Sequence, residues 1–279
     1  MSVKIIIDST ADVTEAVRAR VEVVPLTIRF GEAEYFDGVT IGRREFYERL
    51  VESDALPTTS QATPDAFAEI FERVRLAGDS AVVITISAEL SGTCQSAMIA
   101  AEEYGNIFVV DSRSASIGSG ILVEQALRLA DAGLSAPDIA AELRRCREKV
   151  VVIALLDTLE YLKRGGRLSK TAAFAGGLLN IKPVAGIREG KIVVLGKARG
   201  SRQANNLLTE EIRRAGGVDF EKPILLGYTG LSDALLQKYR QDSAALWQAG
   251  ERELPAALIG SVIGTHAGPG AVAAAFFRP

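Results

Sequence analysis

Short apolar runs alternate with segments of helical periodicity in the first half of the chain, and this alternation constrains the fold most. The runs cover residues 5–7, 23–30, 81–86, 107–110 and 150–156. Helical periodicity separates most of them, as in residues 43–51 and 136–148. Strands separated by helices usually form a parallel sheet that helices cover on both faces. We therefore predict an N-terminal α/β domain with a mainly parallel sheet and flanking helices.

The second half contains more glycine turns. Its pattern predicts a hairpin around Gly190-Lys191, a helix over 201–215, a strand over 223–228 and a helix over 232–247. A glycine-rich loop over 264–270 is expected to carry His266 and to precede a short alanine-rich helix. A length of 279 residues is sufficient for two domains. We place the boundary near 150–157, which gives α/β domains over residues 1–153 and 154–279.

Composition excludes several classes of function. The 32 basic and 35 acidic side chains give a net charge of -3 without a basic cluster among aromatics, so nucleic acid is not an expected partner. The apolar runs are far shorter than the ~20 residues of a membrane helix, and the N-terminal run is too short for a signal peptide. We expect a cytoplasmic protein without stable membrane insertion.

Cofactor motifs are not found in the sequence. Gly118-Ser119-Gly120 lacks the third glycine of a dinucleotide site, and Gly190-Lys191 does not complete a P-loop. The chain has one histidine, and we expect Cys94 and Cys146 to be free thiols. No metal or cofactor is therefore predicted.

Two hydroxyl-rich segments precede predicted helices. Leu90-Ser91-Gly92-Thr93 leads into a helix expected to reach Tyr104, and Thr58-Thr59-Ser60-Gln61 leads into a helix over 64–77. Free backbone N–H groups at a helix start, together with hydroxyls, can bind a carboxylate or phosphate. The alternative is that Ser91 and Thr63 serve only as helix N-caps.

Polar turns follow three of the predicted strands, at residues 8–12, 87–93 and 111–114. Ligands of open α/β sheets bind at these carboxyl ends. Two residues in later turns have two possible roles each. His266 is either structural or functional in its glycine-rich loop, and Arg167, after Gly165-Gly166, is either solvated or directed at an anion.

The order and spacing of several motifs carry a family resemblance. The motifs are Asp8-Ser9-Thr10-Ala11-Asp12, Thr59-Ser60-Gln61, Leu90-Ser91-Gly92-Thr93 with Gln95-Ser96-Ala97, Asp111-Ser112, Leu159 with Lys163 and Gly165-Gly166-Arg167-Leu168, Asn180-Ile181-Lys182-Pro183, and His266 with Gly268-Pro269-Gly270. Over nearly the whole chain they resemble the DegV family of bacterial fatty-acid-binding proteins. Ala62 and Cys94 depart from the family's usual residues.

The resemblance implies two α/β domains with a long-chain fatty acid between them as the bound ligand. Residues matching Thr59 and Ser91 would bind the carboxylate, and residues matching Arg167 and His266 would lie near the head group and support phosphoryl transfer. It also implies a partner, a separate fatty acid kinase of the dihydroxyacetone-kinase-like type, which forms an acyl phosphate for phospholipid synthesis. The chain itself would be a carrier rather than an enzyme.

Two other functions stay open from the sequence. Ser91 and His266 could serve as nucleophile and base of a hydrolase or acyltransferase, although no Gly-x-Ser-x-Gly elbow is present. A fatty-acid-sensing regulator would share the same pocket.

A long acyl chain needs a tunnel to bury it. Burying ~16 carbons contributes roughly 12 kcal/mol before association costs. Residues 117–123 and 174–179 are its candidate walls, with core packing as the alternative.

Overall fold

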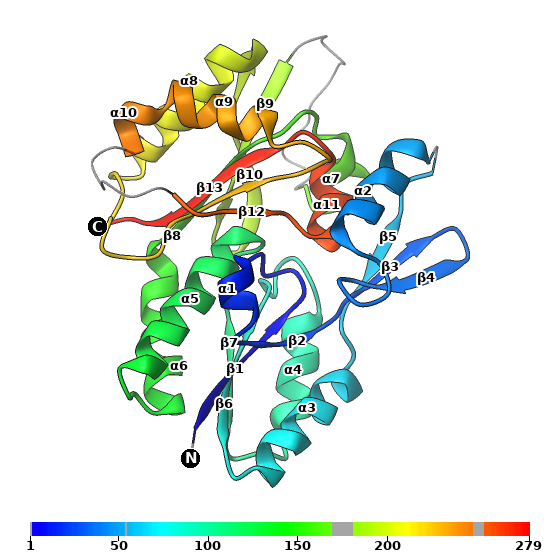
Figure 1. Cartoon of the computed structure of the whole chain (residues 1–279), viewed down its shortest axis with the longest axis vertical. Helices are drawn as coiled ribbons and strands as arrows, with labels where there is room; N and C mark the ends of the chain where they lie inside the picture. Colours follow the sequence, from blue (N-terminus) through cyan, green and yellow to red (C-terminus); the bar gives the residue numbers. More distant parts are fainter. Residues whose placement is uncertain (1, 54, 169–180, 248–253) are drawn as a thin grey trace.

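Three β-sheets organise the chain in the computed structural model, which describes residues 2–53, 55–168, 181–247 and 254–279 (Figure 1). The elements before residue 147 are β1 (Val3–Asp8), α1 (Glu15–Arg18), β2 (Glu22–Val24), β3 (Thr27–Phe30), β4 (Ala33–Phe36), α2 (Arg43–Glu52), β5 (Thr58–Ser60), α3 (Pro64–Leu76), β6 (Ser80–Thr85), α4 (Thr93–Ala101), β7 (Ile107–Asp111), α5 (Ile117–Asp131) and α6 (Ala136–Cys146). The later ones are η1 (Arg147–Lys149), β8 (Val150–Leu155), α7 (Glu160–Arg164), β9 (Ile181–Arg188), β10 (Lys191–Arg199), α8 (Gly200–Arg214), β11 (Leu225–Tyr228), α9 (Ala234–Asp242), α10 (Ala244–Trp247), β12 (Ala256–Leu258), α11 (Ser261–Ala267) and β13 (Val272–Phe277).

The first sheet is parallel, as the alternation predicted. Its order is β2-β1-β6-β7, and every neighbouring pair is parallel. Ile5 and Ile7 of β1 pack in the core under α5 and α6, whereas Ile6 packs in the core under α3. Because helices cover both faces (Figure 1), the strands are apolar at consecutive positions.

The single strand predicted over 23–30 is wrong. Pro25 separates β2 from β3, because proline has no N–H for a ladder and fixes φ. The strand β3 joins a small antiparallel sheet of order β4-β3-β5, in which Ile28 pairs with Thr59. This break therefore moves the chain toward the hydroxyl-rich segment on β5.

The second large sheet has the order β10-β9-β8-β13-β11-β12. Residues 150–156, expected with the parallel strands, instead form β8 between β9 and β13, antiparallel to both. The predicted hairpin is confirmed, since Lys191 of β10 pairs with Arg188 of β9. The helices α8 and α9 pack on one face of this sheet, and α5 approaches the other face.

The segment 264–270 differs from its prediction. His266 lies in the last turn of the helix α11, and the expected alanine-rich helix is the strand β13. Gly260 and Gly264 favour a loop in the sequence pattern, because glycine has a low helix propensity. A Cβ on Gly264 would lie 2.6 Å from the Tyr47 hydroxyl, so glycine permits α11 to pack against α2.

Other predicted helices need only small corrections. The helix expected over 232–247 is divided into α9 and α10 at Ser243, whose hydroxyl donates to the Tyr239 carbonyl and accepts from the Trp247 ring N–H. The helix expected to reach Tyr104 ends at Ala101. Cys94 and Cys146 are free thiols, as predicted, and the structure shows that both are buried.

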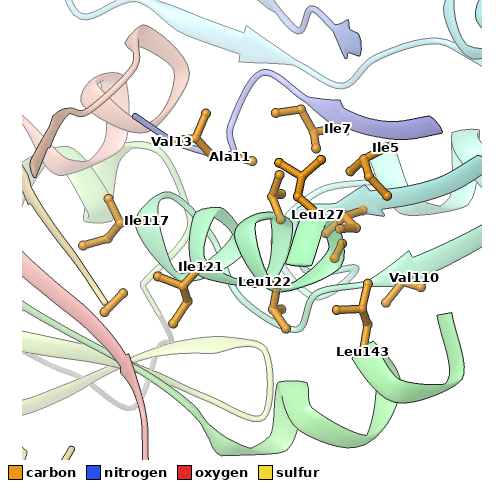
Figure 2. Close-up of a cluster of buried hydrophobic side chains, with 14 of the residues drawn as sticks. Ile5, Ile7, Ala11, Val13, Val110, Ile117, Ile121, Leu122, Leu127 and Leu143 are labelled. Carbon is orange, nitrogen blue, oxygen red and sulfur yellow. The ribbon is translucent and has the colours of Figure 1, made fainter. Parts of the chain in front are cut away.

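The two large sheets share one core. Figure 2 shows buried side chains along α5, from Ile117 beside Val13 to Leu127 beside Ile5 and Ile7 of β1. The same cluster includes Val152 of β8 and Ala273 of β13. The chain passes from the first sheet to the second between β7 and β8. The division into residues 1–153 and 154–279 stays a prediction, with this passage as its support.

Candidate functional site

A cavity lies between the carboxyl ends of the parallel strands and the inner face of the second large sheet. It encloses about 1000 Å³ when its open mouth is included. All four predicted site residues line it, namely Thr59, Ser91, Arg167 and His266. The structure thus brings together polar side chains that are up to 207 positions apart in the chain.

The apolar walls come mostly from the second half. Val152, Ala154 and Leu156 alternate along and just beyond β8, and small residues on the neighbouring strands leave the space open. The further apolar and glycine lining residues are Leu26, Ile86, Leu90, Ala115, Ile117, Leu162, Ala185, Gly186, Ile187, Ile192, Ile259, Val262, Ile263, Ala267, Ala271 and Ala273. A wall with this composition suits a hydrocarbon chain.

The sequence contained a signal for one wall that we did not use. Ile259, Val262, Ile263, His266 and Ala267 recur at helical spacing, and all of them line the cavity from α11 or its start. The neighbouring glycines had favoured a loop. In the strand β8, side chains over residues 150–155 alternate between the two faces of the sheet. The sequence does not indicate which of these faces lines a cavity.

The predicted walls are only partly correct. Of residues 117–123, Ile117 lines the cavity, whereas the other residues of this stretch are buried without lining it. Residues 174–179 lie outside the described ranges, as does Asn180 of the sequence motifs. The turns after β6 and β7 reach the cavity through Leu90, Ser91, Ala115 and Ser116, while the turn at residues 8–12 does not.

Thr59 and His266, which both line the cavity, form a hydrogen bond with each other. Thr59 Oγ1 lies 2.9 Å from His266 Nε2, while Nδ1 is buried without a partner among the described residues. We assign the proton to Nε2, because an unpaired buried N–H costs more than an unpaired lone pair. His266 then donates to Thr59 and leaves the hydroxyl proton of Thr59 for a ligand.

His266 is uncharged at neutral pH in this site. Burial, and next the positive charge of Arg167, lower its pKa to about 4. Gly165 packs directly against the ring, since a Cβ there would lie 2.1 Å from His266 Nδ1. The glycine turn after α7 is therefore a close contact with the imidazole rather than a free surface turn.

Ser91 is not the N-cap of α4, because Gly92 takes that position. Thr63, in contrast, caps α3 by accepting from the Ala66 N–H. Ser91 Oγ accepts from the Thr93 N–H at 3.3 Å and lies 2.9 Å from Thr93 Oγ1. Thr93 is fully buried and needs an acceptor for its hydroxyl proton, so it donates to Ser91. The Ser91 proton is then available to a ligand.

Arg167 bridges the two halves beside these hydroxyls. Its Nε donates to the Leu90 carbonyl at 3.3 Å, and its Nη1 donates to the Gly165 carbonyl at 2.7 Å. The side chain is exposed at the cavity mouth, where it can meet an anion.

Gln61 also lines the cavity, and its side-chain amide donates to Ser96 at 2.9 Å. The sequence analysis assigned no role to this residue.

The described contacts do not assemble a nucleophile and base. His266 Nε2 bonds to Thr59, and the hydroxyl of Ser91 pairs with Thr93. A serine nucleophile requires its base within hydrogen-bond reach. The arrangement suits binding of a carboxylate by two hydroxyl donors, with an apolar chain behind it.

Among the described residues, no group of three or more histidine, cysteine, aspartate or glutamate side chains could hold a metal ion. Within the same ranges, no helix combines the length and the apolar character needed to cross a bilayer.

Comparison with known proteins gives consistent similarities. A family model described as an uncharacterised protein of the DegV family matches residues 2–278. A DegV domain-containing protein of Caldanaerobacter subterraneus is 36% identical over 99% of this chain and 98% of its own length. A fatty-acid-binding DegV protein from Thermus thermophilus superposes with a TM-score of 0.89 at 34% identity, covering 100% of both chains. A stearic-acid-binding protein from Eubacterium ventriosum gives 0.86 at 27% identity, covering 100% of this chain and 98% of that one.

Proposed function

Since the chain belongs to the DegV family, we propose that it binds a long-chain fatty acid in the cavity between its two large sheets. The carboxylate accepts hydrogen bonds from Thr59 and Ser91. The observation that carries this proposal is an apolar cavity lined by the hydroxyls of Thr59 and Ser91. With the proton assignments given above, each hydroxyl can donate to a ligand. The fatty acids bound by similar structures from Thermus thermophilus and Eubacterium ventriosum support the ligand class.

The energetics favour a chain rather than a small acid. Each buried CH₂ contributes about 0.8 kcal/mol, so a chain of about 16 carbons offsets the cost of association and ordering. The hydroxyls and the exposed Arg167 favour the ionised head group. No resident cofactor is part of this proposal.

We further propose that the chain is a cytoplasmic carrier. A separate fatty acid kinase of the dihydroxyacetone-kinase-like type phosphorylates the bound carboxylate for phospholipid synthesis, and Arg167 and His266 support the transfer. The open mouth beside Arg167 supports access to the carboxylate from outside. A fatty-acid-sensing regulator would use the same cavity, and the absence of acyl-phosphate formation with any such kinase would favour it.

Mass spectrometry tests the ligand class. An organic extract of the purified protein is expected to contain one long-chain fatty acid per chain, and a delipidated sample is expected to rebind it. The proposal would be contradicted if no fatty acid co-purified and the delipidated protein did not rebind one.

Substitution of the two hydroxyls tests the carboxylate site. Thr59→Ala and Ser91→Ala should each weaken fatty-acid binding about 10-fold or more, because each removes a charged hydrogen bond of about 1.5 to 3 kcal/mol. Thr58→Ala is the matched control, since Thr58 is exposed on the same strand and does not line the cavity. Titration with a fluorescent fatty acid measures all three. Wild-type affinity in both folded single variants would place the carboxylate elsewhere.

A further inference from the structure

The motif Asp8-Ser9-Thr10-Ala11-Asp12 does not line the cavity, yet its last residue connects the two halves of the chain. Asp12 has no solvent exposure. Its Oδ1 accepts from the Gly260 N–H and its Oδ2 from the Ser116 hydroxyl, both at 2.7 Å. Gly260 directly precedes α11 and is the N-cap residue of that helix.

The other residues around Gly260 are held in the same way. Arg43 Nη1 donates to the Leu258 carbonyl at 2.8 Å, and the Tyr47 hydroxyl donates to the Ile259 carbonyl at 3.0 Å. The Ser261 N–H donates to Asp37 Oδ1 at 3.3 Å. Each residue from 258 to 261 therefore bonds to a side chain from the first 50 residues. We call these four side chains and the segment that they hold the α11 clasp.

The α11 clasp lies at one end of a short rigid element whose other end is in the site. The helix α11 covers only Ser261–Ala267, and it places Val262, Ile263 and His266 at the cavity. A shift of its first turn is transmitted to His266, because a helix of seven residues moves as one body. Ser116, the second partner of Asp12, also lines the cavity.

We propose that Asp12 is a positioning residue of the fatty-acid site, which fixes the start of α11 and so aligns His266 with Thr59. The proposal rests on the proposed function for its ligand. Asp12 does not touch the ligand in this arrangement. It acts through the backbone of Gly260 and the hydroxyl of Ser116.

The charges around Asp12 define the useful substitutions. Two residues of α2 face Asp12, namely Arg43, whose Nη2 lies 3.6 Å from Oδ1, and Tyr47. Asp37 faces it from the turn after β4. Burial raises the pKa of Asp12, whereas Arg43 and the hydrogen bonds lower it. The effect of burial is larger, and the pKa is about 6. A neutral acceptor of the same shape can thus keep the contact with Gly260 at lower desolvation cost. Asp12→Asn should preserve the positioning, whereas Asp12→Ala should remove it.

The single histidine gives a direct readout. In protein labelled with ¹⁵N-histidine and free of fatty acid, NMR reports only His266, and the wild type should show the Nε2–H form with a titration midpoint near pH 4. In Asp12→Ala, the midpoint is expected to rise by at least about one pH unit toward the ordinary histidine value of about 6.5, as the ring leaves its buried site. Asp12→Asn should stay near the wild type.

Ser135→Ala is the matched control, because it removes the N-cap of α6, which does not form part of the cavity. It should lower stability and leave the His266 midpoint unchanged. An unchanged midpoint in folded Asp12→Ala would overturn the proposal. Should that variant not fold, Asp12→Ser, whose hydroxyl is too short to reach Gly260, replaces it with the same expected shift.

Fatty-acid binding is then measured on the same variants. Asp12→Ala is expected to bind about 10-fold more weakly, and Asp12→Asn within about threefold of the wild type. A wild type without fatty-acid affinity, but with a His266 midpoint that responds to Asp12→Ala, would contradict the proposed function and leave the clasp supported. A wild type that binds through Thr59, with an unresponsive midpoint, would contradict only the positioning role.

Discussion

The protonation of His266 links the site to stability. Its pKa is lowered to about 4 by burial and Arg167, whereas in the unfolded chain it is near 6.5. Between these values the unfolded state binds the proton and the folded state does not, so unfolding becomes easier as pH falls from 6.5 to 4.

We therefore expect the wild type to lose about 3 kcal/mol relative to His266→Gln between pH 7.5 and pH 4. Urea unfolding of both proteins at several pH values measures this difference, because carboxylates that titrate equally in both proteins cancel. A difference that does not vary with pH would mean that His266 is not buried in its neutral form.

Arg167 is expected to act in transfer more than in binding. A guanidinium matches the spread charge of a phosphoryl group in transfer. Arg167→Ala should keep fatty-acid affinity within about threefold and lower kinase-dependent acyl-phosphate formation at least about 10-fold. Arg164→Ala is the control, since this exposed arginine on α7 pairs with Glu160 and does not line the cavity. Equal rates in the two variants would remove Arg167 from the transfer step.

Among the secondary-structure elements, α7 and α11 meet at the site through Gly165. A Cβ there would lie 2.1 Å from His266 Nδ1 and 3.1 Å from the Tyr161 carbonyl, so neither neighbour offers space. The turn must move away from α11, or the imidazole must leave Thr59.

Gly165→Ala is expected to cost about 1 to 3 kcal/mol of stability and to weaken fatty-acid binding. Gly105→Ala is the matched control, because a Cβ at Gly105 meets nothing within 4 Å. Denaturant unfolding and ligand titration on both variants provide the comparison. Similar small effects in both would show that the contact with His266 is not tight.

In the molecule as a whole, the cavity lies between two sheets that share a core. A ligand that binds only the folded state at 100 times its Kd adds about 2.7 kcal/mol to stability. For a chain of this size that corresponds to a rise in Tm of about 5 °C.

We expect palmitate to produce this rise, and butyrate at the same concentration to produce none, because butyrate has little chain to bury. Scanning calorimetry of delipidated protein measures both. The double variant Thr59→Ala with Ser91→Ala should lose most of the palmitate effect. An equal rise in that double variant would show that palmitate stabilises the protein outside the proposed site.

The sequence by itself determined features that depend on neighbours along the chain. The parallel strands, the cap at Thr63, the hairpin at Gly190-Lys191 and the hydroxyls at 59 and 91 follow from local spacing, propensity and turn chemistry. The family motifs are likewise a matter of order and spacing, which is why the family was identified from them.

Only the tertiary structure decided which of these features meet. Gly264 lies in a helix that packs closely against Tyr47, and Asp12 bonds to a residue 248 positions away. Ala154 of β8 and Ala273 of β13 line the cavity, whereas Ala274 lies on the other face of the sheet and packs in a core. Contacts of this kind depend on the packing of distant elements, and such packing leaves no periodic signal in the segments that it joins.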